Sequence, residues 1–316
     1  MPGRPFEYPW PTPSGASDSP EWLGRGFRLG DERVSVLSYQ IGDSGWTDEL
    51  TAFHEDTAGS NHPIDRASRE LALEPLGALR ARTPVLLEIG CSSGFMLRLL
   101  RRRLPDAFVI GADYVRGPLE ELAGSLPDVP LLQFDLTTCP LPDRSVDAVI
   151  MLNVLEHIED DAGALDQVQR VLRPGGLLIL EVPAGPNLYD VYDELLLHHR
   201  RYAMSGLRRL VQSSGLEIVR ATHLGVLLYP VFAAVKLRNK RFLSRERALQ
   251  RRVVEQNIRT TGSSALLGAA LGLERALGRR LRWPFGIRCI LAARKPRSGR
   301  PANIPYGRQA APSRGT

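Results

Sequence analysis

The chain has 316 residues, of which 43% are apolar and 24% charged, and this composition excludes a fibrous or wholly disordered protein. Three widely spaced cysteines exclude a disulfide framework and a cysteine-based metal site, so we expect a reducing, cytoplasmic setting. The net charge of +6 is unevenly divided: residues 1–235 hold 21 Lys and Arg against 32 Asp and Glu, whereas residues 236–300 hold 18 against 3. An acidic body therefore precedes a basic segment, and the total charge alone does not indicate a nucleic-acid-binding protein.

Disordered tails are predicted at residues 1–20 and 297–316, which are rich in Pro, Ser and Gly. Between them we expect, in order, an N-terminal extension or lid, a core domain, a basic helical insertion and a strand that closes the core, at residues 21–64, 65–223, 224–285 and 286–296. We expect no signal peptide, because no apolar stretch follows the first charge. The longest apolar run, residues 224–235, is too short for a membrane span, which needs roughly 20 residues.

Short apolar strands alternate with helices through the core domain. The strands are predicted at residues 85–89, 108–113, 131–135, 146–151 and 177–182, and helices at residues 95–104, from residue 118, and at residues 161–172. This alternation predicts an α/β fold in which a parallel sheet has helices on both faces. Two later strands, at residues 216–221 and 288–294, bring the sheet to seven strands, most of them parallel.

Residues suited to ligand binding stand at the ends of three successive strands. The segment from Glu88 to Gly94, with Gly90 and Cys91 within it, closes the first strand and opens a helix, and its glycines allow a tight turn. Asp113 and Asp135 end the next two strands. Each feature alone fits an ordinary turn, a helix cap or a solvated acid, but open parallel sheets bind ligands at these strand ends. Together they predict a nucleotide-type cofactor site.

The turn after the first strand distinguishes two cofactor classes. A dinucleotide turn has the pattern G-x-G-x-x-G, in which the second glycine makes room for a pyrophosphate. Here Ser92 occupies that second position. The carboxylate of Glu88 repels a pyrophosphate but suits the ammonium group of S-adenosylmethionine. The sequence therefore favours S-adenosylmethionine over a nicotinamide dinucleotide.

These residues resemble the class I S-adenosylmethionine-dependent methyltransferases, over roughly residues 71–220 and again at the last strand. The resemblance rests on residues 85–94 (VLLEIGCSSG), Asp113, residues 134–136 (FDL), residues 153–157 (NVLEH) and residues 172–176 (LRPGG). It implies a Rossmann-like sheet and a methyltransferase activity. The insertion before the last strand is an addition to that fold.

The resemblance also implies a role for each cofactor residue. The residues around the methionine portion are Glu88, Gly90 and Gly94. Asp113 holds the ribose, and Asp135 and Leu136 contact the adenine. Cys91 and Tyr114 are further cofactor-binding residues. Asn153 lies beside the reactive centre of the cofactor.

A His-Arg-Arg-Tyr stretch at residues 199–202 resembles a subset of this superfamily that acts on small metabolites or glycan-type acceptors. That resemblance implies acceptor-binding residues after the fifth strand, namely Tyr189, Arg200, Arg201 and Tyr202. Either arginine could pair with an anionic acceptor group. No metal site is predicted.

Methyl transfer to a hydroxyl or amine needs an in-line approach and removal of a proton. His157 and His199 are the candidate general bases, because histidine titrates near neutral pH. His157 also has a simpler explanation, because it could pack the turn after the fourth strand. Two other functions stay open: an RNA methyltransferase that uses the basic insertion, and a catalytically silent binding module built on the cofactor fold.

The insertion begins with the apolar run at residues 224–235, which Lys236, Arg238, Lys240 and Arg241 follow. The simpler interpretation is a helix that packs on the core and continues into a solvated basic extension. The alternative is peripheral contact with a membrane or an anionic carrier. The insertion has few aromatic residues for base stacking, which argues against nucleic acid as a partner.

Overall fold

A computed structural model describes residues 7–39, 62–262, 265–278 and 281–297 of the chain. Among these residues, eight strands form one sheet in the order β10-β11-β9-β8-β5-β6-β7-β4. In chain order the strands are β4 (Val36–Ser38), β5 (Val85–Ile89), β6 (Phe108–Asp113), β7 (Leu131–Gln133), β8 (Val146–Leu152), β9 (Leu172–Pro183), β10 (Glu217–Leu224) and β11 (Arg288–Arg294). β11 runs antiparallel to both of its neighbours, β9 and β10, and the other described pairings of this sheet are parallel. The predicted Rossmann-like α/β fold is confirmed.

The sheet has one strand more than the seven that the sequence predicts. The additional strand, β4, pairs in parallel with β7 at the edge of the sheet, with Val36 opposite Leu131. It comes from the segment expected to be an extension or lid. Three residues with Val36 and Leu37 both buried show no alternation, so the pattern of the sequence does not mark them as a strand.

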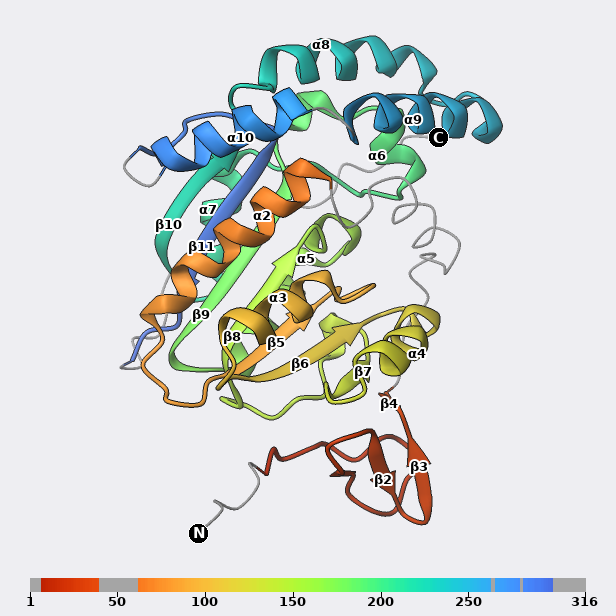
Figure 1. The fold of residues 1–316 in the computed structure, drawn as a ribbon, viewed down its shortest axis with the longest axis vertical. Helices are drawn as coiled ribbons and strands as arrows, with labels where there is room; N and C mark the ends of the chain where they lie inside the picture. Colours follow the sequence, from red (N-terminus) through yellow and green to blue (C-terminus); the bar gives the residue numbers. More distant parts are fainter. Residues whose placement is uncertain (1–6, 40–61, 263–264, 279–280, 298–316) are drawn as a thin grey trace, which may run out of the picture.

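Helices cover both faces of the sheet (Figure 1). They are α2 (Pro63–Leu73), α3 (Phe95–Arg103), α4 (Arg116–Ser125), α5 (Asp161–Val171), α6 (Val191–Leu195), α7 (Met204–Ser213), α8 (Tyr229–Asn239), α9 (Arg247–Gly262) and α10 (Ala265–Gly278). Short 3-10 turns lie at η1 (Glu74–Ala78), η2 (Leu136–Thr138), η3 (Leu155–His157), η4 (Pro186–Leu188) and η5 (Lys240–Phe242).

Two apolar clusters form the core, one on each face of the sheet. In β5, Leu87 belongs to the cluster that includes residues of α5 and α7, whereas Leu86 belongs to the cluster that includes residues of α2, α3 and α4. Successive side chains of a strand point to opposite faces, which explains the division. The apolar strands are thus buried on both sides and present their carboxyl ends as one shared edge.

The N-terminal segment differs from the disordered tail expected for residues 1–20, of which residues 1–6 lie outside the described residues. Tyr8 and Trp10 are buried in the core, and Tyr8 donates a hydrogen bond of 2.8 Å to the Ser145 hydroxyl. Their rings pack against Phe27 and Phe108. A small antiparallel sheet follows, made of β1 (Glu21–Trp22), β2 (Phe27–Leu29) and β3 (Glu32–Val34). Aromatic anchors order a segment whose proline and serine content suggests disorder.

The segment between β10 and β11 contains helices α8, α9 and α10 (Figure 1). Leu271 of α10 packs with Leu71 of α2 and Ile290 of β11, and Val254 of α9 packs with Val191 and Leu196 near α6. Two small apolar clusters therefore join the insertion to the core domain. Within the described parts of the chain, every helix is too short or too polar to cross a membrane.

Candidate functional site at the carboxyl edge of the sheet

The turn after β5 requires glycine at two positions. Gly90 has a φ of 73°, and a Cβ atom there would lie 2.4 Å from the Val154 side chain. Gly94 has a φ of 74° and precedes α3, and a Cβ atom there would lie 2.5 Å from the Leu122 side chain. Larger residues would be strained in both backbone conformation and packing. Ser92 adopts the same left-handed region without being glycine, with a φ of 44°.

Asp113, the last residue of β6, is joined to this turn. Its carboxylate accepts hydrogen bonds from the backbone N–H of Ser92 at 2.9 Å and of Val115 at 3.1 Å. The N–H of Cys91, whose side chain is buried, donates to the Ala112 carbonyl at 3.1 Å. The turn and the end of β6 thus form one rigid unit. A carboxylate has about four acceptor positions, so one such group can hold a turn and also accept hydrogen bonds from a ligand.

Glu88 is the most unusual carboxyl group in this region. It is buried, and its Oε2 atom has no hydrogen-bond partner among the described residues. Burial first, and then the charge of Asp113, raise the pKa of Glu88 well above its usual value, whereas Arg69 of α2 lowers it. An acid that is buried without a partner is costly. A cationic group bound at the edge of the sheet would supply the missing partner.

The end of β7 is a 3-10 turn capped by an acid. Asp135 accepts hydrogen bonds from the Thr137 backbone N–H at 2.8 Å and from its hydroxyl at 2.7 Å, both through Oδ1. Leu136 is buried, and the Tyr114 carbonyl accepts a hydrogen bond of 3.1 Å from Gln133. The cap uses Oδ1 of Asp135. This acid could therefore cap the turn and also bind a ligand through its other oxygen.

Asn153, directly after β8, contacts a residue that the sequence analysis does not select. Its amide donates a hydrogen bond of 3.3 Å to Glu181 of β9, which also receives one of 2.7 Å from Arg288 of β11. Arg288 in turn donates to Asp65 of α2 at 2.6 Å. Glu181 is fully buried. A lone acid within an apolar strand is the signal that could have identified it.

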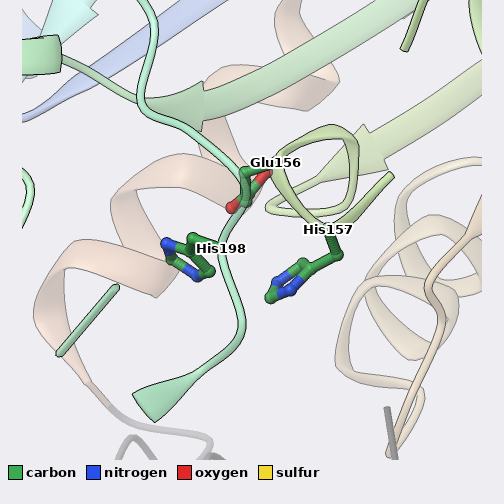
Figure 2. Close-up of side chains that lie close together, drawn as sticks. All are labelled: Glu156, His157 and His198. Carbon is green, nitrogen blue, oxygen red and sulfur yellow. The ribbon is translucent and has the colours of Figure 1, made fainter. Parts of the chain in front are cut away.

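A second group of residues lies just beyond the end of β8, and the sequence analysis recognises only one of its three members. Glu156 is fully buried, and burial raises its pKa to about 8. The rings of His157 and His198 meet edge to face, with centroids 4.6 Å apart. Figure 2 shows the three side chains gathered in one place. One ligand atom from each lies within 4.8 Å of the others. We call these three residues the Glu156 cluster.

His199, the other histidine predicted as a base, is exposed and lies outside the Glu156 cluster. Its backbone N–H donates to the Glu156 carbonyl at 2.9 Å, and the buried histidine is its neighbour His198. Adjacent residues point in different directions in this extended segment. A shift of one residue therefore determines which of the two imidazoles lies in the Glu156 cluster. The prediction names His199, whereas the structure brings its neighbour His198 to Glu156 and His157.

The residues predicted to bind the acceptor are used in contacts within the chain. Arg200 pairs with Asp161 at 2.8 Å, and the Tyr202 hydroxyl donates to the same carboxylate at 2.9 Å. Arg201 is buried and donates to the Ala184 carbonyl at 2.9 Å, while the Tyr189 hydroxyl donates to the His198 carbonyl at 2.9 Å. The stretch folds back beside the end of β9, which explains why its side chains meet the protein.

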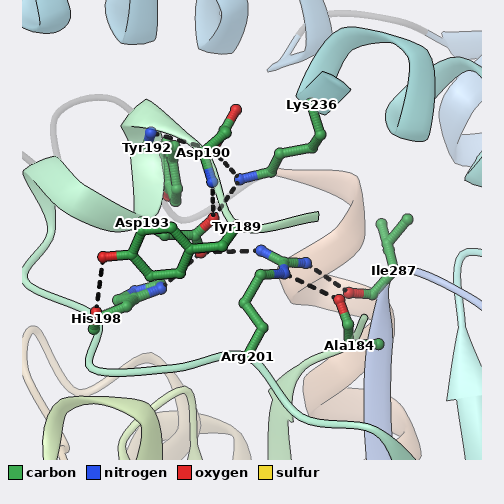
Figure 3. A network of polar contacts seen from close by, with 9 residues as sticks. All are labelled: Ala184, Tyr189, Asp190, Tyr192, Asp193, His198, Arg201, Lys236 and Ile287. Atoms are coloured by element: carbon green, nitrogen blue, oxygen red, sulfur yellow. Dashed lines mark hydrogen bonds and ion pairs between the residues drawn. The ribbon is translucent and has the colours of Figure 1, made fainter. Parts of the chain in front are cut away.

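A buried polar network surrounds Asp193 of α6 (Figure 3). Its carboxylate accepts from His198 Nδ1 at 2.8 Å, Arg201 at 2.9 Å and Lys236 Nζ at 3.0 Å. Although burial acts to raise it, the hydrogen bond from His198 and the charges of Lys236 and Arg201 hold the pKa of Asp193 far below its usual value. Lys236 also donates to Asp190 at 2.6 Å.

The position of Lys236 corrects the sequence-based interpretation of the basic segment. This residue was grouped with a solvated or membrane-facing extension, yet only 5% of it is exposed. It is the first basic residue after the apolar run, and its placement on α8 turns it toward α6 rather than toward solvent.

The core domain is similar in sequence to known proteins. Residues 87–180 match the family described as "Methyltransferase domain". Over 138 residues the chain is 33% identical to a probable S-adenosylmethionine-dependent methyltransferase of Mycolicibacterium smegmatis, covering 42% of this chain and 52% of that protein. Over 121 residues it is 34% identical to a trans-aconitate 2-methyltransferase of an Azoarcus species, covering 37% of this chain and 45% of that protein. The chain spans about half the length of these curated relatives.

One solved structure illustrates the similarity in fold. Phosphoethanolamine N-methyltransferase 2 of Haemonchus contortus, in complex with S-adenosyl-L-methionine, superposes with a TM-score of 0.52 at 16% identity. The match covers 79% of this chain and 57% of that chain. At this identity the likeness concerns the fold.

Proposed function

By its domain at residues 87–180 the chain belongs to the class I S-adenosylmethionine-dependent methyltransferases, and from this premise we propose that it methylates an oxygen or nitrogen atom of a small-molecule acceptor. The observation that carries the proposal is the Glu88 carboxyl group, which is buried at the edge of the sheet with one oxygen unpartnered among the described residues. The ammonium group of the methyl donor fits this oxygen.

Three further contacts complete the proposed donor site. Asp113 would accept hydrogen bonds from a ribose diol, and Gly90 allows the tight turn beside it, because a side chain there would collide with Val154. Asp135 and Leu136 would contact the adenine. When bound, S-adenosylmethionine would supply an activated methyl group: the acceptor lone pair would bond to the methyl carbon in line as the carbon–sulfur bond breaks and S-adenosylhomocysteine leaves. The protein's part is to hold the acceptor in line and to receive its proton.

We propose that the acceptor binds beside Asn153 and the Glu156 cluster, and that a residue of this cluster receives the acceptor's proton. His157 is the residue of this cluster that sequence analysis also selects. Arg200 and Tyr202, in contrast, share the Asp161 carboxylate and would act by shaping the loop. This assignment moves the proposed acceptor residues from the His-Arg-Arg-Tyr side chains to the cluster that this stretch supports.

The test is calorimetric titration of the full chain with S-adenosylmethionine and S-adenosylhomocysteine, followed by a methyl-transfer assay on small acids, amines and glycan-type acceptors. We expect one site per chain and micromolar affinity. Binding without transfer to any acceptor would favour the silent binding module. Salt-dependent RNA binding together with RNA methylation would favour the RNA methyltransferase instead.

We also propose that the insertion contacts an anionic surface. Val231 and Leu237 of α8 are 72% and 55% exposed, and Arg238 and Arg241 beside them are exposed as well. Apolar and basic side chains together suit the interface of an anionic membrane or carrier. Co-sedimentation with vesicles that contain phosphatidylserine, but not with phosphatidylcholine vesicles, is the expected result. Equal sedimentation with both would contradict the electrostatic part of the proposal.

A further inference from the structure

The Glu156 cluster combines residue types that bind metal ions. Glu156 and His157 belong to the η3 turn directly after β8, and His198 follows α6, so two separate segments converge. One ligand atom from each residue lies within 4.8 Å of the other two (Figure 2). Tetrahedral ligands at about 2.1 Å from a zinc ion stand about 3.4 Å apart, so closure onto an ion needs a movement of about 1 Å.

Glu156 supplies the strongest indication of an absent ligand. The residue is 0% exposed, and neither carboxyl oxygen has a hydrogen-bond partner among the described residues. A buried carboxylate without a partner is strongly unfavourable, whereas one that is bound to a cation is not. Among the buried carboxyl groups of the described residues, Glu156 is unusual in that both oxygens lack a hydrogen-bond partner.

The orientation of His198 points to the same conclusion. Its Nδ1 atom lies 2.8 Å from Asp193, whose charge is fixed by Arg201 and Lys236. An ionised carboxylate can only accept a hydrogen bond, so Nδ1 carries the hydrogen and donates it, and Nε2 keeps its lone pair. A carboxylate that orients a histidine in this way is the usual outer-shell arrangement of metal-binding histidines. The network of Figure 3 thus prepares Nε2 to bind an ion.

We propose that Glu156, His157 and His198 bind one divalent transition-metal ion, with Asp193 as the residue that positions His198. Two imidazoles and one carboxylate suit zinc, manganese, iron(II) or cobalt better than magnesium or calcium, which prefer oxygen ligands. No metal site is predicted from the sequence, because His157 and His198 are 41 residues apart in the chain and no role is predicted for Glu156.

Three protein ligands leave at least one coordination position for another group. Glu156 follows Asn153 by three residues in the chain, and we propose that the acceptor occupies that open position. A metal ion lowers the pKa of a hydroxyl bound to it, which would ease removal of the acceptor's proton. This role rests on the proposed methyltransferase function, whereas the metal site itself does not.

The experiment measures metal binding without donor or acceptor. The full chain is treated with a chelator, dialysed and titrated by calorimetry with Zn²⁺, Mn²⁺ and Mg²⁺, and with Co²⁺ by visible absorption. We expect one transition-metal ion per chain and weaker binding of Mg²⁺. Glu156→Gln and His198→Gln should each weaken binding at least about tenfold, and Asp193→Asn about 10- to 100-fold.

His199→Ala serves as the matched control, because it removes the neighbouring exposed imidazole and should leave metal affinity unchanged. Binding of S-adenosylhomocysteine in the presence of chelator shows that each variant is folded and tests the donor site separately. Failure of stoichiometric metal binding, or equal metal affinity in wild type and His198→Gln, would overturn the metal site. Loss of donor binding in the wild type would instead overturn the proposed function.

Discussion

The ammonium of Lys236 lies 3.0 Å from a carboxylate oxygen of Asp193, so the insertion between β10 and β11 contacts the same acid that orients His198. The pair is buried on both sides. An added helix of the chain therefore contributes directly to the support of the Glu156 cluster.

Replacing Lys236 should test that support. Lys236→Met retains the length of the side chain but leaves Asp190 and Asp193 without their shared cation, and removal of one partner of a buried pair costs roughly 3 kcal/mol. We expect a loss of that order in the free energy of unfolding measured with urea. Arg238→Met, at an exposed position of the same helix, should change stability by less than about 0.5 kcal/mol. Equal effects of the two variants would contradict the structural role of Lys236.

Donor binding should depend on Asp113. Asp113→Ala removes the ribose acceptor and also the carboxylate that accepts the Ser92 N–H, so affinity for S-adenosylhomocysteine should fall at least about 100-fold. Asp106→Ala, at an exposed position before β6, is the matched control and should bind as the wild type does. Calorimetry at one pH suffices, and unchanged affinity in Asp113→Ala would exclude the ribose role.

The affinity for S-adenosylmethionine should rise with pH through the titration of Glu88. Burial and the neighbouring Asp113 charge favour the protonated form of Glu88 in the free protein, whereas a bound ammonium favours the carboxylate. Binding should therefore release a proton, which calorimetry in buffers of different ionisation enthalpy detects. Glu88→Gln should lose both most of the affinity and the pH dependence. A wild-type affinity that does not vary between about pH 6 and about pH 8.5 would contradict this prediction.

The same carboxyl group should make the free protein less stable as the pH rises. The pKa of Glu88 is higher in the folded than in the unfolded state, so its contribution to folding is complete below the unfolded pKa and is lost as the pH rises through the folded pKa. Glu88→Gln cannot titrate. Thermal unfolding should therefore show the variant gaining on the wild type as the pH is raised from about 5 to about 8. A constant difference between the two proteins would argue against a raised pKa.

The strands that the sequence predicts correctly are those whose burial on both faces gives continuous apolar runs. Leu86 and Leu87 are covered by different helix layers, and such double coverage produces the continuous apolar runs that predict β5 and its neighbours. The turn at Gly90 could also be predicted from the sequence, because only glycine fits the backbone conformation and the close contact with the Val154 side chain at this position.

The rest of the site depends on tertiary placement that local patterns do not encode. His198 and His199 are adjacent, and only the fold decides that the first is buried against Asp193 and the second is exposed. Lys236 looks like the start of a basic surface until α6 supplies two carboxylates beside it. Tyr8 and Trp10 stand in a proline-rich segment, and their burial follows from the aromatic partners Phe27 and Phe108.

Strand β4 bears on whether copies of the chain associate through the edge of the sheet. A strand at the border of a sheet offers unpaired backbone groups to which another chain can add, and proteins commonly shorten or cover such borders. On the β7 side, this border is β4, which is only three residues long. A chain shortened to begin at residue 62 would lack β4, so the backbone groups of β7 would be exposed, and it would also lack the Tyr8 and Trp10 contacts. We therefore expect the N-terminal segment to reduce self-association through this edge of the sheet.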